Sequence, residues 1–268
     1  MMRVVLFSPT GKSIYARMVL HLLAQEPGVE VAGVVIRGIW SWRRLRGDLR
    51  RDGPRLMRKI YAKLVLGERA YAPQDTDSLV WHLREAGLEG QSLKRICRAR
   101  GIACISVRDL NSAKVETFLK ARETDLVVFT GGGLIRRKIL ALPRLGVMNC
   151  HAGILPRYRG MDVVEWAILE AQAEPETGLT LHFMDPGVDT GPILLREPVR
   201  PRAGEDLARL RTRMEGRMPF LVLEGVRGLK DGRLQPIMQE PEDGRQYFVI
   251  HPRLRCAAER RLAAILGS

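Results

Sequence analysis

The sequence predicts an α/β fold in which helices cover both faces of a doubly wound, mostly parallel, Rossmann-like sheet. Short apolar runs without polar alternation, such as Val4–Phe7 and Asp125–Phe129, are typical of strands that are buried on both faces. These runs alternate along the chain with segments of helical spacing, which favours parallel β–α units. Glycines and polar residues follow where the apolar runs end, and ligands of such sheets bind beyond those ends.

Length and composition indicate a globular protein. The 268 residues are enough for one sizeable core with an appendage, and a hydrophobic fraction of 46% is ordinary. No apolar run approaches the roughly 18 residues of a membrane span, and the first apolar run is too short for a signal peptide. The four cysteines lack C-x-x-C spacing, so we expect reduced thiols in a cytoplasmic protein.

The first predicted strand leads through a turn into a helix over Ile14–Leu23, and a second strand follows over Val29–Ile36. The turn is similar to the end of a phosphate-binding P-loop, but Leu6 occupies the position of the first glycine of that motif. A strand–turn–helix junction can still bind an anion through its backbone N–H groups, and a plain turn is the alternative. The residues concerned are Thr10, Gly11, Lys12 and Ser13.

The net charge of +14 is concentrated in one segment. Arg37–Arg69 contains 11 Lys and Arg residues against three acidic ones. We expect residues 37–72 to form a basic insertion, helical around Trp40–Leu49 and Leu56–Leu66, because the segment is long for a connection within a compact domain. Such a cluster suits a nucleic acid, a phosphorylated substrate or an acidic membrane surface, and a solvated helix pair is the alternative.

The middle of the chain continues the alternation with a helix, a strand and a helix, at Gln91–Ala99, Ile102–Ile105 and Val115–Ala121. The strand that follows ends in a loop of Gly131, Gly132, Gly133, Leu134 and Ile135. Glycines after a buried strand indicate the close approach of a ligand or of a neighbouring backbone, and a tight structural turn is the alternative. A dinucleotide fingerprint is excluded, because the G-x-G-x-x-G spacing fails at Arg136.

Two polar side chains, Asn149 and His151, stand at the end of the next predicted strand, Val147–Cys150. Residues at i and i+2 of a strand point the same way, about 6–7 Å apart along it, so both can reach one small group. Cys150 lies between them and points to the opposite face, which argues against a Cys–His nucleophile.

A helix and two strands complete the sheet, at Val164–Ala171, Leu179–Met184 and Ile193–Val199. After Pro201 the pattern changes and predicts a helix, a hairpin and a basic terminal helix, at Glu205–Val226, Leu234–Ile250 and Leu254–Leu266. We therefore expect a main domain over residues 1–200 and a short extension of a helix, a hairpin and a helix over residues 201–268.

Three motifs stand in a fixed order: N-x-H at Asn149–His151, L-P-x-x-R-G at Leu155–Gly160 and D-x-G at Asp189–Gly191. In this order they resemble the folate-dependent formyltransferases, a family that includes the glycinamide ribonucleotide, methionyl-tRNA and amino-sugar N-formyltransferases. The similarity is strongest over Asp125–Val199. It implies the formyltransferase fold, a catalytic domain at residues 1–200, and an enzyme of one-carbon metabolism with 10-formyltetrahydrofolate as co-substrate.

The resemblance also implies roles for individual residues. Asn149 and His151 donate hydrogen bonds to a developing oxyanion, while Asp189 orients His151 and raises its proton affinity, or holds a water that relays the proton. The pterin is contacted by the glycine loop and the turn before Asp189, that is by Gly131, Gly132, Gly133, Leu134, Ile135, Met184 and Asp185. The first loop, Thr10, Gly11, Lys12 and Ser13, helps to hold the acceptor.

A metal site is a separate hypothesis, because His182, Asp185 and Asp189, together with His151, are residue types that ligate metals. Nothing in the sequence fixes the spacing of such ligands, so we expect no metal. One departure from the family pattern concerns the acceptor. The chain reads Ala152-Gly153 after His151, where a serine is common in the family, and this places the identity of the acceptor in doubt.

Several functions fit these motifs. The stretch H-x-G-x-L-P-x-Y-R-G favours a primary amine of a small molecule as acceptor, with a nucleotide-linked amino sugar as one candidate. The alternatives are a methionyl-tRNA formyltransferase, a formyltetrahydrofolate deformylase with water as acceptor, and a non-catalytic folate-binding or nucleic-acid-binding module. The extension over 201–268 is a candidate contact for a homodimer.

Overall fold

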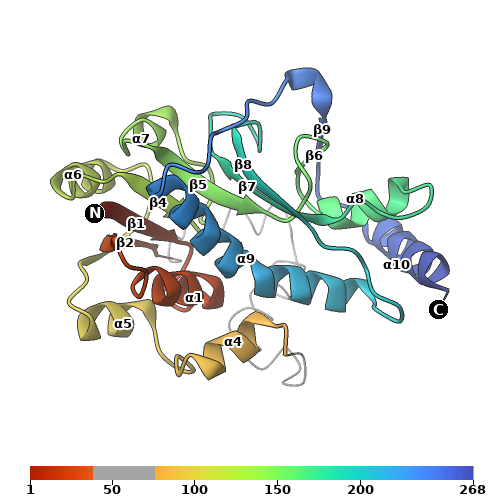
Figure 1. Ribbon diagram of the computed structural model, residues 1–268, viewed down its shortest axis with the longest axis horizontal. Coiled ribbons are helices and arrows are strands. Elements are labelled where there is room, and N and C mark those ends of the chain that lie inside the picture. Colours follow the sequence, from red (N-terminus) through yellow and green to blue (C-terminus); the bar gives the residue numbers. More distant parts are fainter. Residues whose placement is uncertain (39–75, 268) are drawn as a thin grey trace.

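The computed structural model describes residues 1–38 and 76–267, and its centre is a seven-stranded sheet (Figure 1). The strand order is β3-β2-β1-β4-β5-β7-β8. The first five strands in this order are parallel to one another. Strand β7 is antiparallel to both of its neighbours, β5 and β8. The predicted mostly parallel α/β sheet is therefore confirmed. The strands are Met2–Ser8 (β1), Val29–Arg37 (β2), Cys104–Val107 (β3), Leu126–Phe129 (β4), Gly146–His151 (β5), Gly178–Phe183 (β7) and Ile193–Pro198 (β8).

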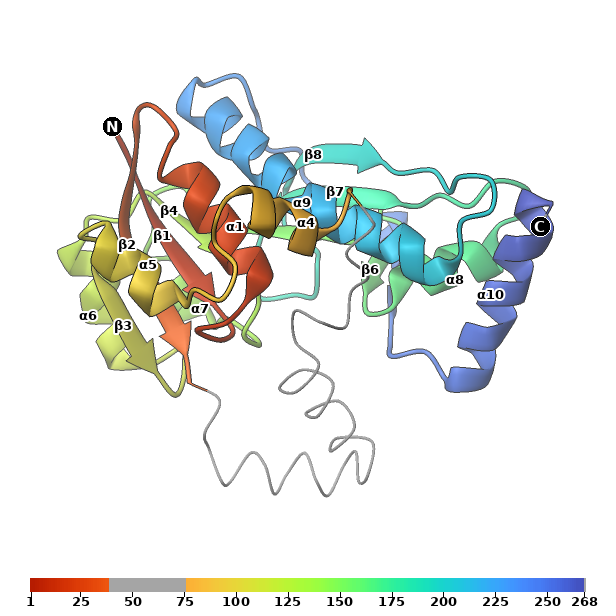
Figure 2. The same cartoon turned by 90° about the horizontal axis from the view of Figure 1, so that it is seen from below.

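Helices cover both faces of the sheet (Figures 1 and 2). One face packs against Ile14–Leu23 (α1), Leu79–Glu85 (α4), Leu93–Ala99 (α5) and Leu207–Lys230 (α9). The other face packs against Ala113–Ala121 (α6) and Arg137–Leu140 (α7). Val163–Glu170 (α8) and Pro252–Leu266 (α10) pack against each other beyond the sheet. The helices expected at Trp40–Leu49 and Leu56–Leu66 lie outside the described residues.

Alternation along β5 decides which side chains can form a site. Met148 and Cys150 join the core beneath α1 and α9, while Val147 joins the core beneath α6 and α7. Asn149 and His151 consequently share the face of Val147, because successive strand residues point to opposite faces. The prediction that Cys150 points away from the polar pair is confirmed, and burial raises the pKa of its thiol.

Serine and aspartate side chains determine where several helices begin. Ser13, Ser78, Ser92 and Asp206 each accept a hydrogen bond from a backbone N–H in the first turn of α1, α4, α5 and α9. The helices α4 and α7 were not predicted, and the four residues of α7 are too few for a clear helical period. Within the described residues, no helix combines the length and apolar character that crossing a bilayer requires.

The C-terminal part differs from the prediction in one respect. The predicted helix is present as α9, and Leu210 and Val226 on it belong to the main core. The prediction of a hairpin over Leu234–Ile250 is wrong. Ile237 forms an isolated antiparallel bridge with Ile193 of β8, and Arg245–Tyr247 (β9) pairs in parallel with Tyr158–Gly160 (β6).

The two halves of the expected hairpin thus find different partners. A 3₁₀ turn, Pro241–Asp243 (η3), separates them, so they do not face each other. The backbone groups of each half are satisfied by strands that come earlier in the chain. The boundary at residue 200 and a homodimer contact through residues 201–268 both stay predictions.

Candidate active site

Asn149 lies directly opposite His182 in the antiparallel pairing of β5 with β7. His182 is 1% exposed, and its Nδ1 lies 2.8 Å from the carbonyl oxygen of Phe183. A carbonyl can only accept, so Nδ1 of His182 carries a proton. In the neutral ring Nε2 is then an acceptor, whereas in the protonated ring it donates to Oδ1 of Asp189, which lies 3.5 Å away. Asn149 Nδ2 donates to that Nε2 over 3.2 Å. One of the two amide protons of Asn149 is therefore fixed, and the second is left for another acceptor.

His151 lies between two of the predicted motifs. Its Nε2 donates to the carbonyl oxygen of Tyr158, in the L-P-x-x-R-G motif, over 2.8 Å. Its Nδ1 faces Oδ2 of Asp189, in the D-x-G motif, over 3.4 Å. Because Nε2 already carries a proton, a neutral ring has its lone pair on Nδ1, and a second proton there would form an ion pair with Asp189.

Asp189 belongs to the loop between β7 and β8, which folds back toward β5. Its backbone has φ of 54°, a left-handed conformation that aspartate tolerates better than most residues. The backbone N–H of Gly160 donates to Oδ2 over 2.9 Å, and Oδ1 lies 3.5 Å from Nε2 of His182. The structure thus brings Asn149, His151 and Asp189 together.

The glycines of two motifs are explained by close backbone contacts. A Cβ on Gly191 would lie 2.0 Å from the carbonyl oxygen of Phe183, and one on Gly160 would lie 2.1 Å from that of Tyr247. Gly191 therefore lets the loop of Asp189 fold back onto β7, and Gly160 lets β6 pair with β9. Both contacts are incompatible with any side chain.

Burial and neighbouring charge act in opposite directions on His151. Burial lowers its pKa most strongly, Asp189 and the Tyr158 carbonyl raise it, and His182 lowers it, which leaves the pKa below the ordinary 6.5. Burial also raises the pKa of Asp189, but the hydrogen bond with His182, the two histidines and the Gly160 N–H together bring it below its ordinary value. Near neutral pH, a neutral imidazole therefore faces a carboxylate, which is an arrangement suited to accepting a proton.

The glycine loop follows β4 at the same edge of the sheet. Gly131, Gly132 and Gly133 have φ of 112°, 130° and 98°, which only glycine adopts readily. Leu134 is 79% exposed, whereas Ile135 is 5% exposed and its side chain belongs to the core. Contact of this loop with a pterin stays a prediction, and Ile135 offers its main chain rather than its side chain.

The other predicted binding residues stabilise the loops that carry them. Oδ1 of Asp185 accepts from the Gly187 N–H over 3.0 Å and from the Thr190 hydroxyl over 2.7 Å, which shapes the loop of Asp189. The backbone N–H of Met184 donates to Val147 over 2.7 Å. The roles of Met184 and Asp185 toward a folate stay predictions.

In the first loop, Thr10 Oγ1 accepts from the Lys12 N–H over 3.2 Å, and Ser13 begins α1 as its N-cap. Gly11 has open space around its Cα, and Lys12 is exposed. A role for Thr10, Gly11, Lys12 and Ser13 toward an acceptor therefore stays a prediction.

Two functional neighbours were not predicted from the sequence. His182 was weighed only as a metal ligand, although a histidine inside an otherwise apolar strand indicates a buried polar contact. Gln239, which binds the backbone of Asp189 over 3.1 Å, has no local signal because 50 residues separate the two. Among residues 1–38 and 76–267, no group of three or more His, Cys, Asp and Glu side chains is arranged to hold a metal ion.

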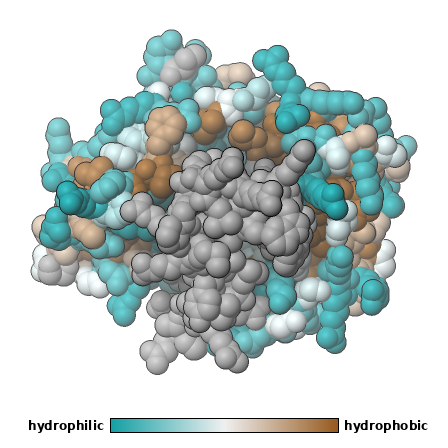
Figure 3. Space-filling view, turned by 180° about the vertical axis from the view of Figure 1, so that it is seen from behind, coloured by the Kyte–Doolittle hydropathy of each residue, from teal (hydrophilic) through white to brown (hydrophobic). Residues whose placement is uncertain are grey.

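Exposed apolar side chains lie next to the motif that contacts Asp189. Met161, which follows Gly160, is 57% exposed, and its N–H donates to Tyr247. Phe248, the next residue after Tyr247, is 70% exposed. Seen from the side opposite to Figure 1, the described surface also carries hydrophobic areas among hydrophilic ones (Figure 3). Apolar surface of this kind is typical of binding sites.

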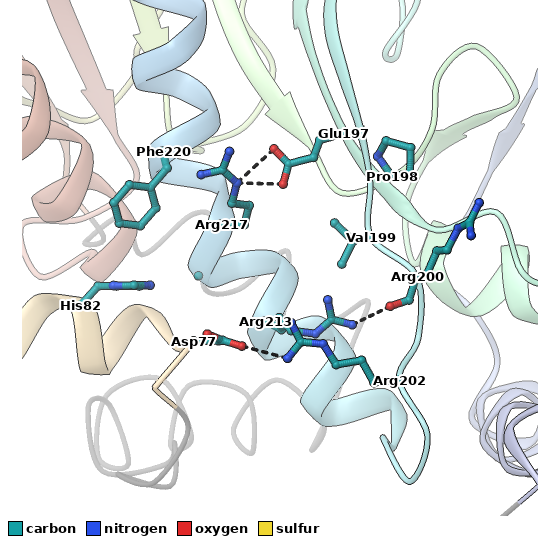
Figure 4. Close-up of a pocket in the computed structure, with 11 residues that line it drawn as sticks. Asp77, His82, Glu197, Pro198, Val199, Arg200, Arg202, Arg213, Arg217 and Phe220 are labelled. Carbon is teal, nitrogen blue, oxygen red and sulfur yellow. Dashed lines mark hydrogen bonds and ion pairs between the residues drawn. The ribbon is translucent and has the colours of Figure 1, made fainter.

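A cavity of about 470 Å³ lies elsewhere, on the α9 side of the sheet (Figure 4). Its arginines already pair with carboxylates: Arg217 with Glu197 at 2.8 Å, Arg202 with Asp77 at 3.2 Å and Arg213 with Glu205 at 2.7 Å. These charges are balanced within the protein, and the cavity is separated from Asn149 and His151 by the sheet. We assign it no role in the chemistry.

Comparison with known proteins connects this geometry to a family. A family model described as formyl transferase matches residues 84–221, which are 138 of the 268 residues. The methionyl-tRNA formyltransferase of Pelobacter propionicus is 38% identical over 125 residues, which cover 47% of this chain and 39% of that protein. The matches cover between 38% and 66% of the length of such relatives.

Solved structures share the fold. A sugar N-formyltransferase from Shewanella sp FDAARGOS_354 has a TM-score of 0.58 at 14% identity, covering 98% of this chain and 88% of that one. A phosphoribosylglycinamide formyltransferase from Anaplasma phagocytophilum has a TM-score of 0.58 at 16% identity, covering 93% of this chain and 99% of that one. At this level of identity, the likeness establishes the architecture and leaves the acceptor open.

Proposed function

Because this chain belongs to the formyl transferase family, we propose that it transfers a formyl group from 10-formyltetrahydrofolate to a primary amine, with Asn149, His151 and Asp189 as its catalytic residues. The observation that carries the proposal is the convergence of the three motifs. His151 lies between the Tyr158 carbonyl at 2.8 Å and the Asp189 carboxylate at 3.4 Å, and Asn149 lies on the same face of β5.

Formyl transfer requires a donor to the formyl oxygen and an acceptor for the proton of the amine. Asn149 supplies the donor, because His182 occupies one of its amide protons and leaves the other. Both ring nitrogens of His151 face groups of the protein, Nε2 the Tyr158 carbonyl and Nδ1 the Asp189 carboxylate. This arrangement suits His151 to accept the proton of the amine rather than to donate a hydrogen bond to the oxyanion. When Nδ1 takes up that proton, directly or through a water, the imidazolium is stabilised by Asp189 and by the Tyr158 carbonyl.

The folate would lie beside the glycine loop. Positive φ values at Gly131, Gly132 and Gly133 turn the main chain at the carboxyl end of β4, and the exposed Leu134 adds apolar surface for a planar ring. Met184 and Asp185 begin the loop of Asp189, so contact with a folate there would connect its binding to the catalytic carboxylate.

We favour a small amine as the acceptor, with a nucleotide-linked amino sugar as one candidate. A specific observation supports methionyl-tRNA as the second candidate: curated relatives at 32% to 38% identity include methionyl-tRNA formyltransferases, and the chain carries a net charge of +14. Salt separates the two, because the affinity for tRNA, with its many phosphates, falls steeply as salt rises, while the affinity for a nucleotide-linked amino sugar, with only a few phosphates, falls much less.

The proposal predicts that tetrahydrofolate is released only when an amine is present. Release can be followed spectrophotometrically with 10-formyltetrahydrofolate and a panel of amino sugars, amino nucleotides and methionyl-tRNA. Equal release without any amine would identify a deformylase instead. Binding of the folate without release in any mixture would identify a non-catalytic module.

The rate should depend on pH through His151. Its neutral form accepts the proton, so kcat/KM should rise with pH and reach a plateau once the ring is deprotonated. Because burial holds the pKa of His151 below the ordinary 6.5, the plateau should begin on the acid side of neutrality. A pH–rate profile checks this, and an acid limb centred above 7 would contradict the assigned role.

A further inference from the structure

The segment from Ile237 to Tyr247 crosses both loops of the candidate site. At one end, the backbone of Ile237 exchanges two hydrogen bonds of 2.8 Å with Ile193, which follows the loop of Asp189. At the other end, β9 pairs with β6 in the L-P-x-x-R-G motif. Figure 1 shows this part of the chain running from the edge of β8 to β6. The segment therefore connects the loop that carries Asp189 to the loop that contacts His151.

Gln239 bridges the two loops with a single side chain. Its Nε2 donates to the carbonyl oxygens of Asp189 at 3.1 Å and Gly191 at 2.5 Å. Its Oε1 accepts from Nε of Arg159 at 3.2 Å and from Nη2 at 3.1 Å. An amide has two donor protons and two acceptor lone pairs, and all four are used here. Each end of the amide therefore holds a different loop.

Arg159 fixes the orientation of this amide. The arginine is 5% exposed, and its Nη2 also donates to the carbonyl oxygen of Glu240 over 2.9 Å. It stands between Tyr158, whose carbonyl accepts from His151, and Gly160, whose N–H donates to Asp189. Because Arg159 can only donate, Oε1 of Gln239 must face it and Nε2 must face the loop of Asp189.

We propose that Gln239 is a positioning residue for formyl transfer, which sets the distance between the Asp189 carboxylate and the His151 ring. This inference rests on the proposed function for its kinetic consequence. The arrangement requires a neutral amide, because an oxygen in place of Nε2 would face two carbonyl oxygens. A displacement of a reacting group by about 1 Å can lower a rate by about 100-fold, so a loosened loop should have a large effect.

The Gln239→Met variant removes both sets of hydrogen bonds and keeps the length and neutrality of the side chain. We expect a fall in kcat of about 100-fold with little change in the KM for the folate. Gln246→Met is the matched control, because Gln246 is an exposed glutamine on β9. Gln239→Glu is the second variant. Gln239→Glu keeps an acceptor for Arg159, so it tests the proposal even if the Gln239→Met variant does not fold. We expect a lower kcat in Gln239→Glu as well.

A second measurement does not depend on turnover. The titratable groups that face His151 are Asp189 and His182, and Asp189 raises its pKa. When the loop of Asp189 loosens, the pKa of His151 should fall in Gln239→Met and stay unchanged in Gln246→Met, as measured by NMR of labelled histidine. Unaltered kcat in both Gln239 variants, or an unaltered His151 titration in Gln239→Met, would overturn the proposal. If the wild type transfers no formyl group, the proposed function fails, and the titration still decides the role of Gln239.

Discussion

Replacing Asp189 with asparagine should lower kcat by about 10²–10⁴-fold, the range that a positioned proton-transfer group typically contributes. An amide lacks the negative charge that stabilises a proton on His151, and the Asp189 carboxylate is the charge that raises the pKa of that histidine. The pKa of His151 should therefore fall further, so the acid limb of the pH–rate profile should move to lower pH while the plateau drops. Asparagine has the shape of aspartate and tolerates the left-handed backbone at this position, where φ is 54°.

Asp162→Asn is the matched control for that backbone conformation. Asp162 has φ of 52°, and its carboxylate accepts from the Ile250 N–H at 3.0 Å rather than from the catalytic residues. Steady-state kinetics and thermal melting should show normal folding in both variants and a loss of turnover in the Asp189 variant alone. Near-normal kcat in Asp189→Asn would refute its role.

Replacing Asn149 with alanine should remove about 2.7–4 kcal/mol of transition-state stabilisation, which corresponds to a loss in kcat of about 10²–10³-fold. The reason is the second amide proton, which the contact of Asn149 with His182 leaves for the formyl oxygen. Since the charge on that oxygen develops only in the transition state, the KM for the folate should change little.

The expected fall in kcat with little change in KM distinguishes a role in the transition state from a role in substrate binding. Gln246→Ala removes an amide from an exposed position on β9 and should leave both constants unchanged. A variant Asn149→Ala with normal kcat and a raised KM would show that Asn149 binds the ground state instead. That result would indicate that His151 or a backbone N–H, rather than Asn149, donates the hydrogen bond to the oxyanion.

Local patterns were sufficient to predict most of the fold. Apolar runs without alternation identified β1 and β4, and the helix predicted over Ile14–Leu23 has the same bounds in the structure. These elements are predictable because a buried strand or an amphipathic helix reveals its burial within about ten residues of sequence. The short helices α4 and α7 were missed, and the four residues of α7 carry too little periodicity to indicate a helix.

Local patterns also predicted one part of the site and not the other. Asn149 and His151 are neighbours on one strand, so their common orientation followed from alternation alone. The placement of Asp189 beside them came from a family resemblance, and the structure adds the reason. Gly191 allows the loop to fold back against Phe183, where a Cβ would lie 2.0 Å from the carbonyl oxygen. No pattern within the loop itself indicates where it folds.

Pairing between distant segments was out of reach. The expected hairpin failed because β9 pairs with β6, and Ile237 pairs with Ile193, both far back in the chain. Gln239 meets Arg159 across 80 residues, in a segment that the sequence predicts as part of the hairpin. Short strands of three residues provide too few side chains to specify a partner from sequence.

The central claim is that Asn149, His151 and Asp189 move a formyl group from a folate to an amine. Its most direct test is to incubate the wild-type protein and Asp189→Asn with 10-formyltetrahydrofolate labelled with ¹³C in the formyl group, in the presence of the amine panel, and to follow the label by mass spectrometry and NMR. We expect the label to appear on one class of amine with the wild type and to stay on the folate with the variant. Label that appears as free formate, or that reaches the amine equally fast with both proteins, would contradict the claim.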